Sequence, residues 1–198
     1  MKRILVSALA LSACGLLAFA PTSGTTAPAA PAAYTVDGVH SFVTFRCKHL
    51  NTSFAYGRFD KIAGTIGFDD AKPEANSLNI EVMTDSVSTT NVNRDKHLKS
   101  DAFFDASQFP KATFVSKSFA KSGENTFDVK GDFTLRGVTK EITIKLEKTG
   151  QGKGQGGKEI IGFESTFTIN RMDYGVKFMP DMLGQDVRIT VALESGKN

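Results

Sequence analysis

The chain has 198 residues, 40% of them apolar and 23% charged, a composition typical of one soluble globular domain. Its net charge is +3, and two of the positive charges, Lys2 and Arg3, lie in an N-terminal targeting segment. So little charge on the remaining chain gives no reason to expect a nucleic acid as partner.

Residues 1–20 are predicted to be a secretory signal, because Lys2 and Arg3 precede a short apolar run. Two processing sites fit. Ala18-Phe19-Ala20 has the small-x-small form, although Pro21 follows it, and Leu11-Ser12-Ala13-Cys14 is similar to a lipobox. Both predict export to the periplasm or cell envelope. Membrane association is expected only if Cys14 is lipidated.

Residues 21–33 form a Pro/Ala/Thr-rich linker, so the folded domain is expected to span residues 34–198. Cys47 has no partner once the signal is removed, which excludes a disulfide framework. It lies mid-strand among apolar positions and is expected to be a small buried side chain.

The first three strands are predicted at residues 34–50, at residues 53–69 and around Leu78, Ile80 and Val82, because apolar and polar side chains alternate there. The alternation then stops. Residues 90–108 carry helix-start signals, with Asn91 or Asn93 as one cap and Ser100 with Asp101 as another. One or two short helices are expected here, covering a barrel end or an opening.

Strands resume at residues 111–119, 125–136 and 138–149, and two more carry Phe163 to Ile169 and Val187 to Leu193. The hairpin 125–149 has one apolar and one charged face. The glycine-rich segment 150–157 is expected to be a flexible hairpin tip, since it lacks the spacing of a phosphate-binding loop.

About eight alternating strands, joined in sequence with one helical break, predict an antiparallel sandwich or barrel. A barrel is favoured because closing the sheet removes its exposed edges. Eight strands enclose a space that holds packed side chains or one slender ligand.

A metal site and an enzyme are both predicted to be absent. His40 and His49 are an odd number of residues apart and so face opposite sides of one strand, and His97 lies in the helical segment. No nucleophile, base and orienting group form a convincing set. Asp37 and His40 are close enough in sequence to form a local hydrogen bond.

Several ordered segments together resemble the YceI-like family of polyisoprenoid-binding proteins. They are Val36-Asp-Gly-Val-His-Ser41, Val43-x-Phe-x-Cys-x-His49, Arg94-Asp-Lys-His-Leu-Lys-Ser100 with Phe103-Phe104, Phe109-Pro-Lys-Ala-Thr-Phe114, Gly131-Asp-Phe-Thr-Leu-Arg-Gly-Val-Thr139 and Asn170-Arg-Met-Asp-Tyr-Gly175. The resemblance runs from Tyr34 to the end and departs at Cys47, where an aliphatic residue is usual, and in the glycine-rich segment 150–157. It implies an extended, lipocalin-like antiparallel barrel in the bacterial envelope, with an apolar tunnel for an isoprenoid or other amphipathic chain.

The expected function is non-catalytic binding, transport or storage of an isoprenoid quinone, a polyprenyl lipid or a fatty-acid-like molecule, with no required cofactor. The alternative is a structural or stress-response interaction module with a filled barrel. The sequence does not determine the oligomeric state, and a homodimer is one of the options. The residues expected to contact the lipid are Val43, Phe45, Cys47, His49, Phe103, Phe104, Phe127, Val129, Phe133, Leu135, Ile142, Ile144, Phe163, Phe167 and Ile169. The polar candidates for the mouth are His40, Arg94, Asn170 and Arg171, which alternatively pin the helix and a strand end.

Overall fold

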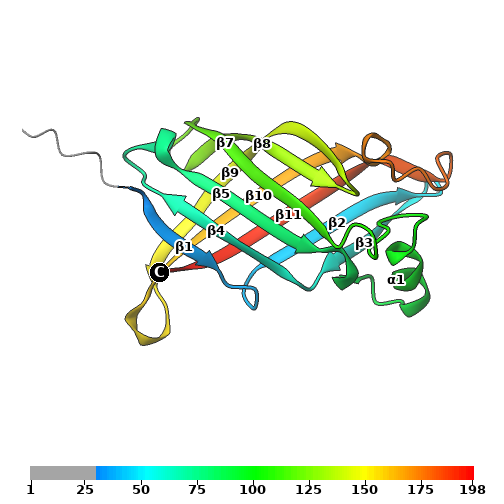
Figure 1. The fold of residues 1–198 in the computed structure, drawn as a ribbon, viewed down its shortest axis with the longest axis horizontal. Coiled ribbons are helices and arrows are strands. Elements are labelled where there is room, and N and C mark those ends of the chain that lie inside the picture. Colours follow the sequence, from blue (N-terminus) through cyan, green and yellow to red (C-terminus); the bar gives the residue numbers. More distant parts are fainter. Residues whose placement is uncertain (1–29) are drawn as a thin grey trace, which may run out of the picture.

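In a computed structural model, which describes residues 30–198, the chain forms one antiparallel sheet that closes into a barrel (Figure 1). The strands are β1 (Ala32–Val36), β2 (Phe42–His49), β3 (Ser53–Phe59), β4 (Ile62–Phe68), β5 (Ser77–Met83), β6 (Val87–Ser88), β7 (Lys111–Lys121), β8 (Thr126–Leu135), β9 (Val138–Lys153), β10 (Glu159–Asn170) and β11 (Leu183–Lys197). The helix is α1 (Val92–Lys99), and short 3-10 turns lie at Pro73–Ala75, Thr84–Ser86, Gln155–Gly157 and Arg171–Tyr174.

Pairing of β1 with β11 closes a ring of eight strands in the order β1, β4, β5, β7, β8, β9, β10 and β11. The remaining strands extend this ring toward α1: β2 pairs with β11, β3 with β2, and β6 with β3. The predicted barrel of about eight strands is therefore confirmed. All eight strands of the ring come from residues 32–197.

Two predicted strands are each divided. Segment 34–50 is broken between β1 and β2, where the Asp37 carboxylate accepts hydrogen bonds from the backbone N–H groups of Val39 and His40 and stabilises a turn. Segment 53–69 is broken between β3 and β4 at residues 60–61. Strand β1 also begins at Ala32, two residues inside the predicted linker.

Residues 1–20 with the lipobox cysteine Cys14, and residues 21–29 of the linker, lie outside the described residues. Within the described part of the chain, the helix is too short and too polar to cross a bilayer.

The helical segment forms one α-helix. Asn91 caps α1 by accepting a hydrogen bond from the backbone N–H of Arg94 at 3.0 Å. Of the two predicted caps, Asn91 and Asn93, the structure therefore confirms Asn91. Ser100 ends the same helix, and residues 101–109 form turns, so a second helix does not follow. The predicted tip at 150–157 is shorter than expected, because β9 continues to Lys153.

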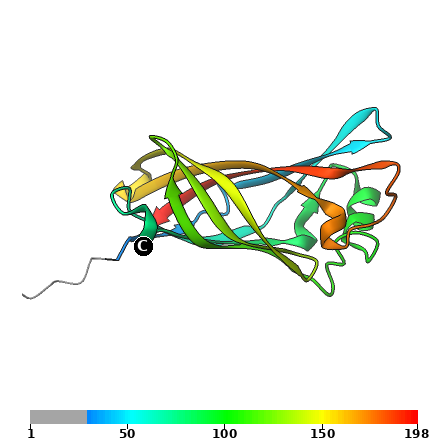
Figure 2. The same ribbon diagram turned by 90° about the horizontal axis from the view of Figure 1, so that it is seen from above.

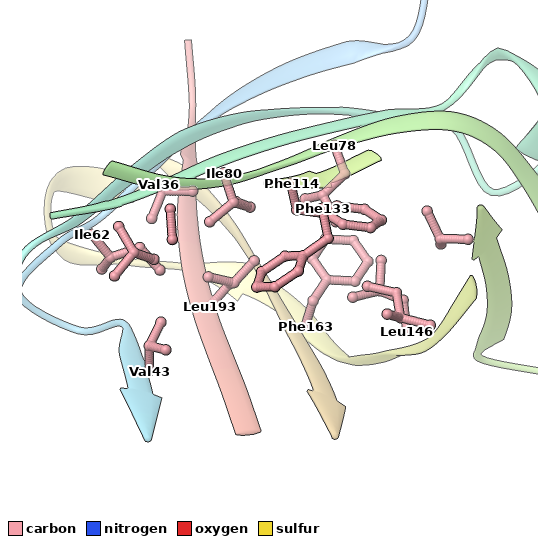
Figure 3. Close-up of a cluster of buried hydrophobic side chains, with 14 of the residues drawn as sticks. Val36, Val43, Ile62, Leu78, Ile80, Phe114, Phe133, Leu146, Phe163 and Leu193 are labelled. Carbon is pink, nitrogen blue, oxygen red and sulfur yellow. The ribbon is translucent and has the colours of Figure 1, made fainter. Parts of the chain in front are cut away.

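Strand β8 shows how the alternation becomes a core. Phe127, Val129, Phe133 and Leu135 are all buried, as their shared parity predicts. Gly131 lies between them because a Cβ there would stand 2.5 Å from the carbonyl oxygen of Val115, where β7 bulges. The inward side chains of β4, β5, β8, β10 and β11 meet in one cluster (Figure 3).

The two ends of the barrel differ. At the end that carries both described termini, four phenylalanine rings fill the interior, and we call this set, Phe68, Phe119, Phe127 and Phe163, the phenylalanine plug. Ring centroids of Phe68 lie 5.5 Å from Phe127 and 5.1 Å from Phe163, in edge-to-face contact. At the other end, the helix end, lie α1, the β2–β3 hairpin and residues 171–182 (Figure 2).

We predict that Phe163→Ala lowers the free energy of unfolding by about 3–5 kcal/mol, because Phe163 is 1% exposed and its loss leaves a cavity in the plug. Urea denaturation measures the change. Phe42→Ala is the matched control, since Phe42 points outward and is half exposed, and it should cost less than about 1 kcal/mol. Equal losses in the two variants would contradict a packed plug.

Candidate functional site

A cavity of about 490 Å³ occupies the half of the barrel nearest the helix end. This volume lies within the range of sites that enclose a small organic ligand. Its lining is mostly apolar and comes from β2, β3, β5, β7, β8, β9, β10 and β11, from α1, and from the segments at residues 103–104 and 176–179.

The phenylalanine plug sets the depth of the cavity. Leu146 and Leu193 line the cavity, and their strand partners, Phe127 and Phe163, belong to the plug. The hollow therefore stops where the four rings meet. The barrel is therefore filled with side chains at the plugged end and hollow toward the helix end.

Three aromatic rings form one wall near the helix end. Phe45 on β2, Phe59 on β3 and Phe104 have centroids 5.4–6.5 Å apart. The ring of Phe45 lies over Gly57, where a Cβ would come within 2.3 Å of it. The absence of a side chain at Gly57 therefore leaves the space that the Phe45 ring occupies.

A second aromatic group lies at the end of the cavity beside α1. The His97 ring lies 5.0 Å from Phe103 and 4.9 Å from Phe178, and these two phenylalanines are 5.2 Å apart. Phe178 is 38% exposed while Phe103 is buried, so this group reaches from the interior to solvent. The cavity opens at this end.

Arg171 holds the segment that forms one side of the mouth. Its side chain is 4% exposed, and its guanidinium donates to the backbone carbonyls of residues 176, 178, 179, 183 and 184 at 2.6–3.3 Å. Burial lowers its pKa from the ordinary value, yet the carbonyl oxygens satisfy the charge. Arg171 thus shapes the mouth through the backbone.

Arg94 and Arg136 fix the other side. The Arg94 guanidinium donates to the hydroxyl and carbonyl oxygens of Thr89, both at 2.7 Å. Arg136, in the β8–β9 turn, donates to the carbonyls of Asp101 and Gly175 and so ties two loops at the helix end together. Arginine, histidine, threonine and serine line the cavity, whereas no Asp or Glu does among the residues that the structure describes.

Cys47 lies on the cavity wall, half buried. Its thiol donates to the carbonyl of Gly184 at 3.2 Å. Burial raises the pKa of the thiol above its usual value, and the nearby Arg171 charge opposes part of that rise. The side chain was expected to be a small buried hydrophobe, and it is in contact with the hollow.

Eleven of the residues expected to contact a lipid line the cavity. They are Val43, Phe45, Cys47, His49, Phe103, Phe104, Phe133, Leu135, Ile144, Phe167 and Ile169. Four lie elsewhere, which corrects the expected lining. Phe127 and Phe163 belong to the plug, Val129 is fully buried in the core cluster, and Ile142 is partly buried against that cluster. The alternation of apolar and polar residues predicts which side chains face the interior, but it does not predict where along the barrel axis each side chain lies.

Of the polar mouth candidates, Arg94 and Arg171 line the cavity, whereas His40 and Asn170 do not. Asn170 caps the turn Arg171–Tyr174 by accepting a hydrogen bond from the Met172 N–H. His40 lies on the outside, between β1 and β2.

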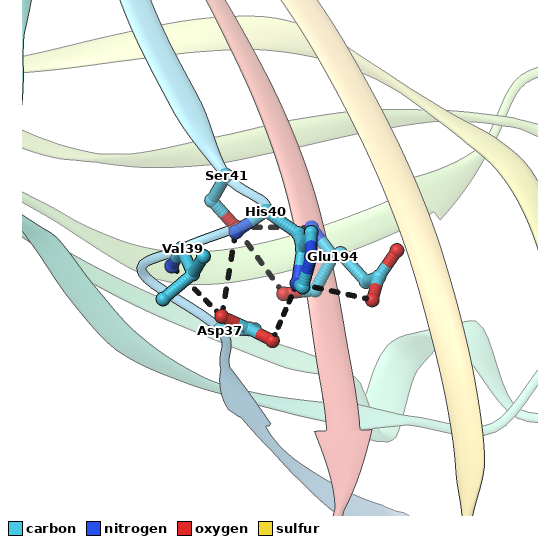
Figure 4. Close-up of polar contacts among 5 residues, drawn as sticks. All are labelled: Asp37, Val39, His40, Ser41 and Glu194. Atoms are coloured by element: carbon cyan, nitrogen blue, oxygen red, sulfur yellow. Dashed lines mark hydrogen bonds and ion pairs between the residues drawn. The ribbon is translucent and has the colours of Figure 1, made fainter. Parts of the chain in front are cut away.

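The His40 ring lies 2.9 Å from the Asp37 carboxylate and 3.9 Å from Glu194 (Figure 4). The predicted Asp37–His40 contact is confirmed. The hydrogen bond with Asp37 raises the pKa of His40 and lowers the pKa of Asp37. These three side chains are grouped closely enough to hold a metal ion, but the contacts already account for their arrangement as a turn-stabilising cluster.

Several lining residues were not anticipated. Six of them lie on the apolar face of predicted strands, so the alternation in the sequence already indicated that they face the interior. They are Leu78, Ile80, Val187, Ile189, Val191 and Leu193. Phe59 lies at a strand end, and His97 and Phe178 lie in the helix and a loop. Nothing in their local pattern indicates that tertiary contacts bring them to the cavity.

Comparison with known proteins gives a consistent result. The profile of the YceI-like domain matches residues 34–195. A UPF0312 protein of Pseudomonas savastanoi pv. phaseolicola is 43% identical over 163 residues, which is 81% of this chain and 84% of the relative. Protein YceI of Salmonella agona is 38% identical over 178 residues, 89% of this chain and 93% of the relative.

Solved structures share the architecture. A YceI protein of Campylobacter jejuni has a TM-score of 0.69 at 33% identity and covers 76% of this chain and 90% of its own. A polyisoprenoid-binding domain from Saccharophagus degradans has a TM-score of 0.67 at 18% identity, covering 84% of this chain and 99% of its own. The second likeness shows the fold alone.

We predict that Arg171→Lys loosens the mouth. A lysine cannot reproduce the planar set of donors that reaches five carbonyls, so the free energy of unfolding should fall by about 2–4 kcal/mol. Amide hydrogen exchange at residues 176–184 should accelerate. Arg58→Lys is the control, because Arg58 is exposed in its pair with Asp60 and should change stability by less than about 1 kcal/mol. Unchanged exchange at residues 176–184 would refute the role given to Arg171.

Proposed function

The chain belongs to the YceI-like family, and we propose that it binds one apolar or amphipathic lipid in the hollow half of its barrel without catalysing a reaction. The observation that carries this proposal is the cavity itself, which is lined mainly by apolar side chains and opens at the helix end. Carriage or storage of a lipid needs an enclosed apolar space with an entrance and no reactive group.

Elementary energetics supports a lipid chain as the occupant. Burying one CH₂ group contributes about 0.8 kcal/mol, so a five-carbon isoprene unit contributes roughly 4 kcal/mol before costs. Ordering the chain and losing its free motion offset much of this gain. A few units still suffice for micromolar affinity. The phenylalanine plug would limit the length of chain that enters.

The polar lining indicates how the head of such a molecule would be held. Arg94 and His97 stand at the open end, and the cavity wall contains no carboxylate among the described residues. A head group with hydrogen-bond acceptors fits these donors. An isoprenoid quinone, a polyprenyl lipid and a fatty-acid-like molecule all meet this condition. The solved domain from Saccharophagus degradans, described as polyisoprenoid-binding, agrees with the first two.

Export to the periplasm or cell envelope remains part of the proposal. It rests on the charged and apolar pattern of residues 1–20. A lipid carrier is useful in that compartment, because lipids must pass through water between or along membranes.

Organic extraction of the protein purified from its own envelope, followed by mass spectrometry, tests the proposal. We expect one class of lipid at up to one molecule per chain. Repeated extractions without an apolar molecule, together with no binding of an added isoprenoid quinone or fatty acid, would refute it and favour the interaction-module alternative.

A bulky residue in the hollow should displace the lipid while the fold is kept. Ile189 lines the cavity beside Phe45, its register partner on β2, so we predict that Ile189→Trp lowers the amount of extracted lipid at least about tenfold. Thr44→Trp is the matched control, since Thr44 is exposed on the outer face of β2. Thermal unfolding verifies that both variants are folded. Equal lipid content in the two variants would place the ligand elsewhere.

Cys47 provides a native probe. It is the one cysteine of segment 30–198, because the other cysteine is Cys14. We predict that bound lipid slows modification of Cys47 by an apolar maleimide at least about tenfold, because both molecules would occupy the same space. Without lipid, the rate should still rise well above neutral pH, since the thiolate reacts and burial raises the thiol pKa. Mass spectrometry follows the reaction, and a rate unaffected by lipid would contradict this location.

A further inference from the structure

Exposed apolar side chains gather around the mouth of the cavity. Nine large apolar side chains are exposed in the described part of the chain, and six of them lie at the helix end. Val92 begins α1, and we call the other five the rim: Leu50, Phe54, Tyr56, Phe178 and Met182. Such grouping at one end of a barrel, beside the entrance to an apolar cavity, marks an interaction surface.

The rim is continuous in space. Leu50, at the tip of the β2–β3 hairpin, donates its backbone N–H to the carbonyl of Met182 at 2.7 Å. Phe178 belongs to the same loop as Met182 and contacts His97 of α1. The hairpin, the loop and the helix all lie at one end of the molecule (Figure 2). A flat partner could therefore contact all three together.

Backbone geometry indicates that the apolar residue at the tip serves a purpose other than folding. Leu50 and Asn51 are the central residues of the turn that the Thr52 N–H closes on the His49 carbonyl at 3.0 Å, and their φ values of 49° and 54° are both in the left-handed region. Asn and Gly suit this region, whereas leucine is disfavoured there. The turn would fold better with a polar residue at position 50, and yet it presents an exposed leucine.

Positive charge surrounds the rim. Segments 46–56, 92–99 and 176–183 contain six Lys or Arg residues and two Asp residues, a net charge of +4. The whole chain carries +3, so the remainder has a net charge of −1. Arg46 and Lys48 lie over the ring of Phe54, at 4.4 and 4.9 Å from its centroid, which places cations directly beside an exposed apolar side chain.

From these observations we propose that the rim docks onto the surface of a bilayer that contains anionic lipid. Apolar side chains would enter the boundary of the acyl chains, and the cations would contact the anionic head groups. The mouth would then face the bilayer, so that a lipid passes into the cavity without crossing water. A second copy of the chain fits less well, since a two-fold contact would press two surfaces of +4 together.

Co-sedimentation with vesicles tests the proposal. The protein is the full chain, so that the N-terminal segment is present in every variant compared, and the vesicles are phosphatidylcholine alone or phosphatidylcholine mixed with phosphatidylglycerol. We expect binding to the anionic vesicles that salt weakens. Leu50→Asn and Met182→Gln should each reduce binding about tenfold. Neither residue lines the cavity.

Val39→Asn is the matched control, because Val39 is exposed in the turn between β1 and β2, outside the rim. It should bind vesicles as the original chain does. Leu50→Asn should leave the melting temperature unchanged or raise it, since asparagine suits a positive φ. Loss of vesicle binding with a stable fold would then come from the lost apolar side chain.

Three outcomes would overturn the proposal. They are equal binding to both kinds of vesicle, undiminished binding by the Leu50→Asn variant, and a dimer in analytical ultracentrifugation that this substitution dissociates while vesicles are not bound. The last result would make the rim a contact between two copies. Lipid extraction examines the cavity separately, so failure here is distinguishable from failure of the proposed lipid binding.

Discussion

Closure of the sheet by β1 and β11 is the constraint on which the rest of the structure depends. Once the edges pair, each strand has one face toward an interior of fixed width and one toward water. The interior of the barrel can then be packed with the chain's own side chains, or it can contain a cavity. This barrel does both, at opposite ends.

The placement of aromatic rings decides which end is filled. Rings packed edge to face around Phe68 leave no room at one end. Near α1, the rings of Phe45, Phe59 and Phe104 lie against the wall, and Gly57 provides the space for this arrangement. Similar residues thus produce a plug in one half and a lining in the other, because in the first they converge on the axis.

Much of this fold could be predicted from the sequence, because the face of a strand is a local property. Alternation placed Val43 and Phe133 inward correctly, and Asn91 marked the start of α1. Depth is not local. Phe163 and Phe167 share a parity four residues apart, yet the first belongs to the plug and the second lines the cavity. Phe178 reaches the mouth through a loop that Arg171 holds, and no periodic pattern encodes that contact.

A half-empty barrel has an energetic consequence that connects stability with function. Side chains around a hollow lack the dispersion contacts that a packed interior would supply, so this half contributes less stability per residue than the plug. Under the proposed function, an apolar guest would restore those contacts and stabilise the folded state by mass action. The plug, the closed ring and the carbonyl network of Arg171 therefore maintain the shape while the hollow is empty. With one end packed and the other hollow, the chain can keep an apolar cavity open in water. A uniformly packed barrel would exclude a guest, and a uniformly hollow barrel would collapse.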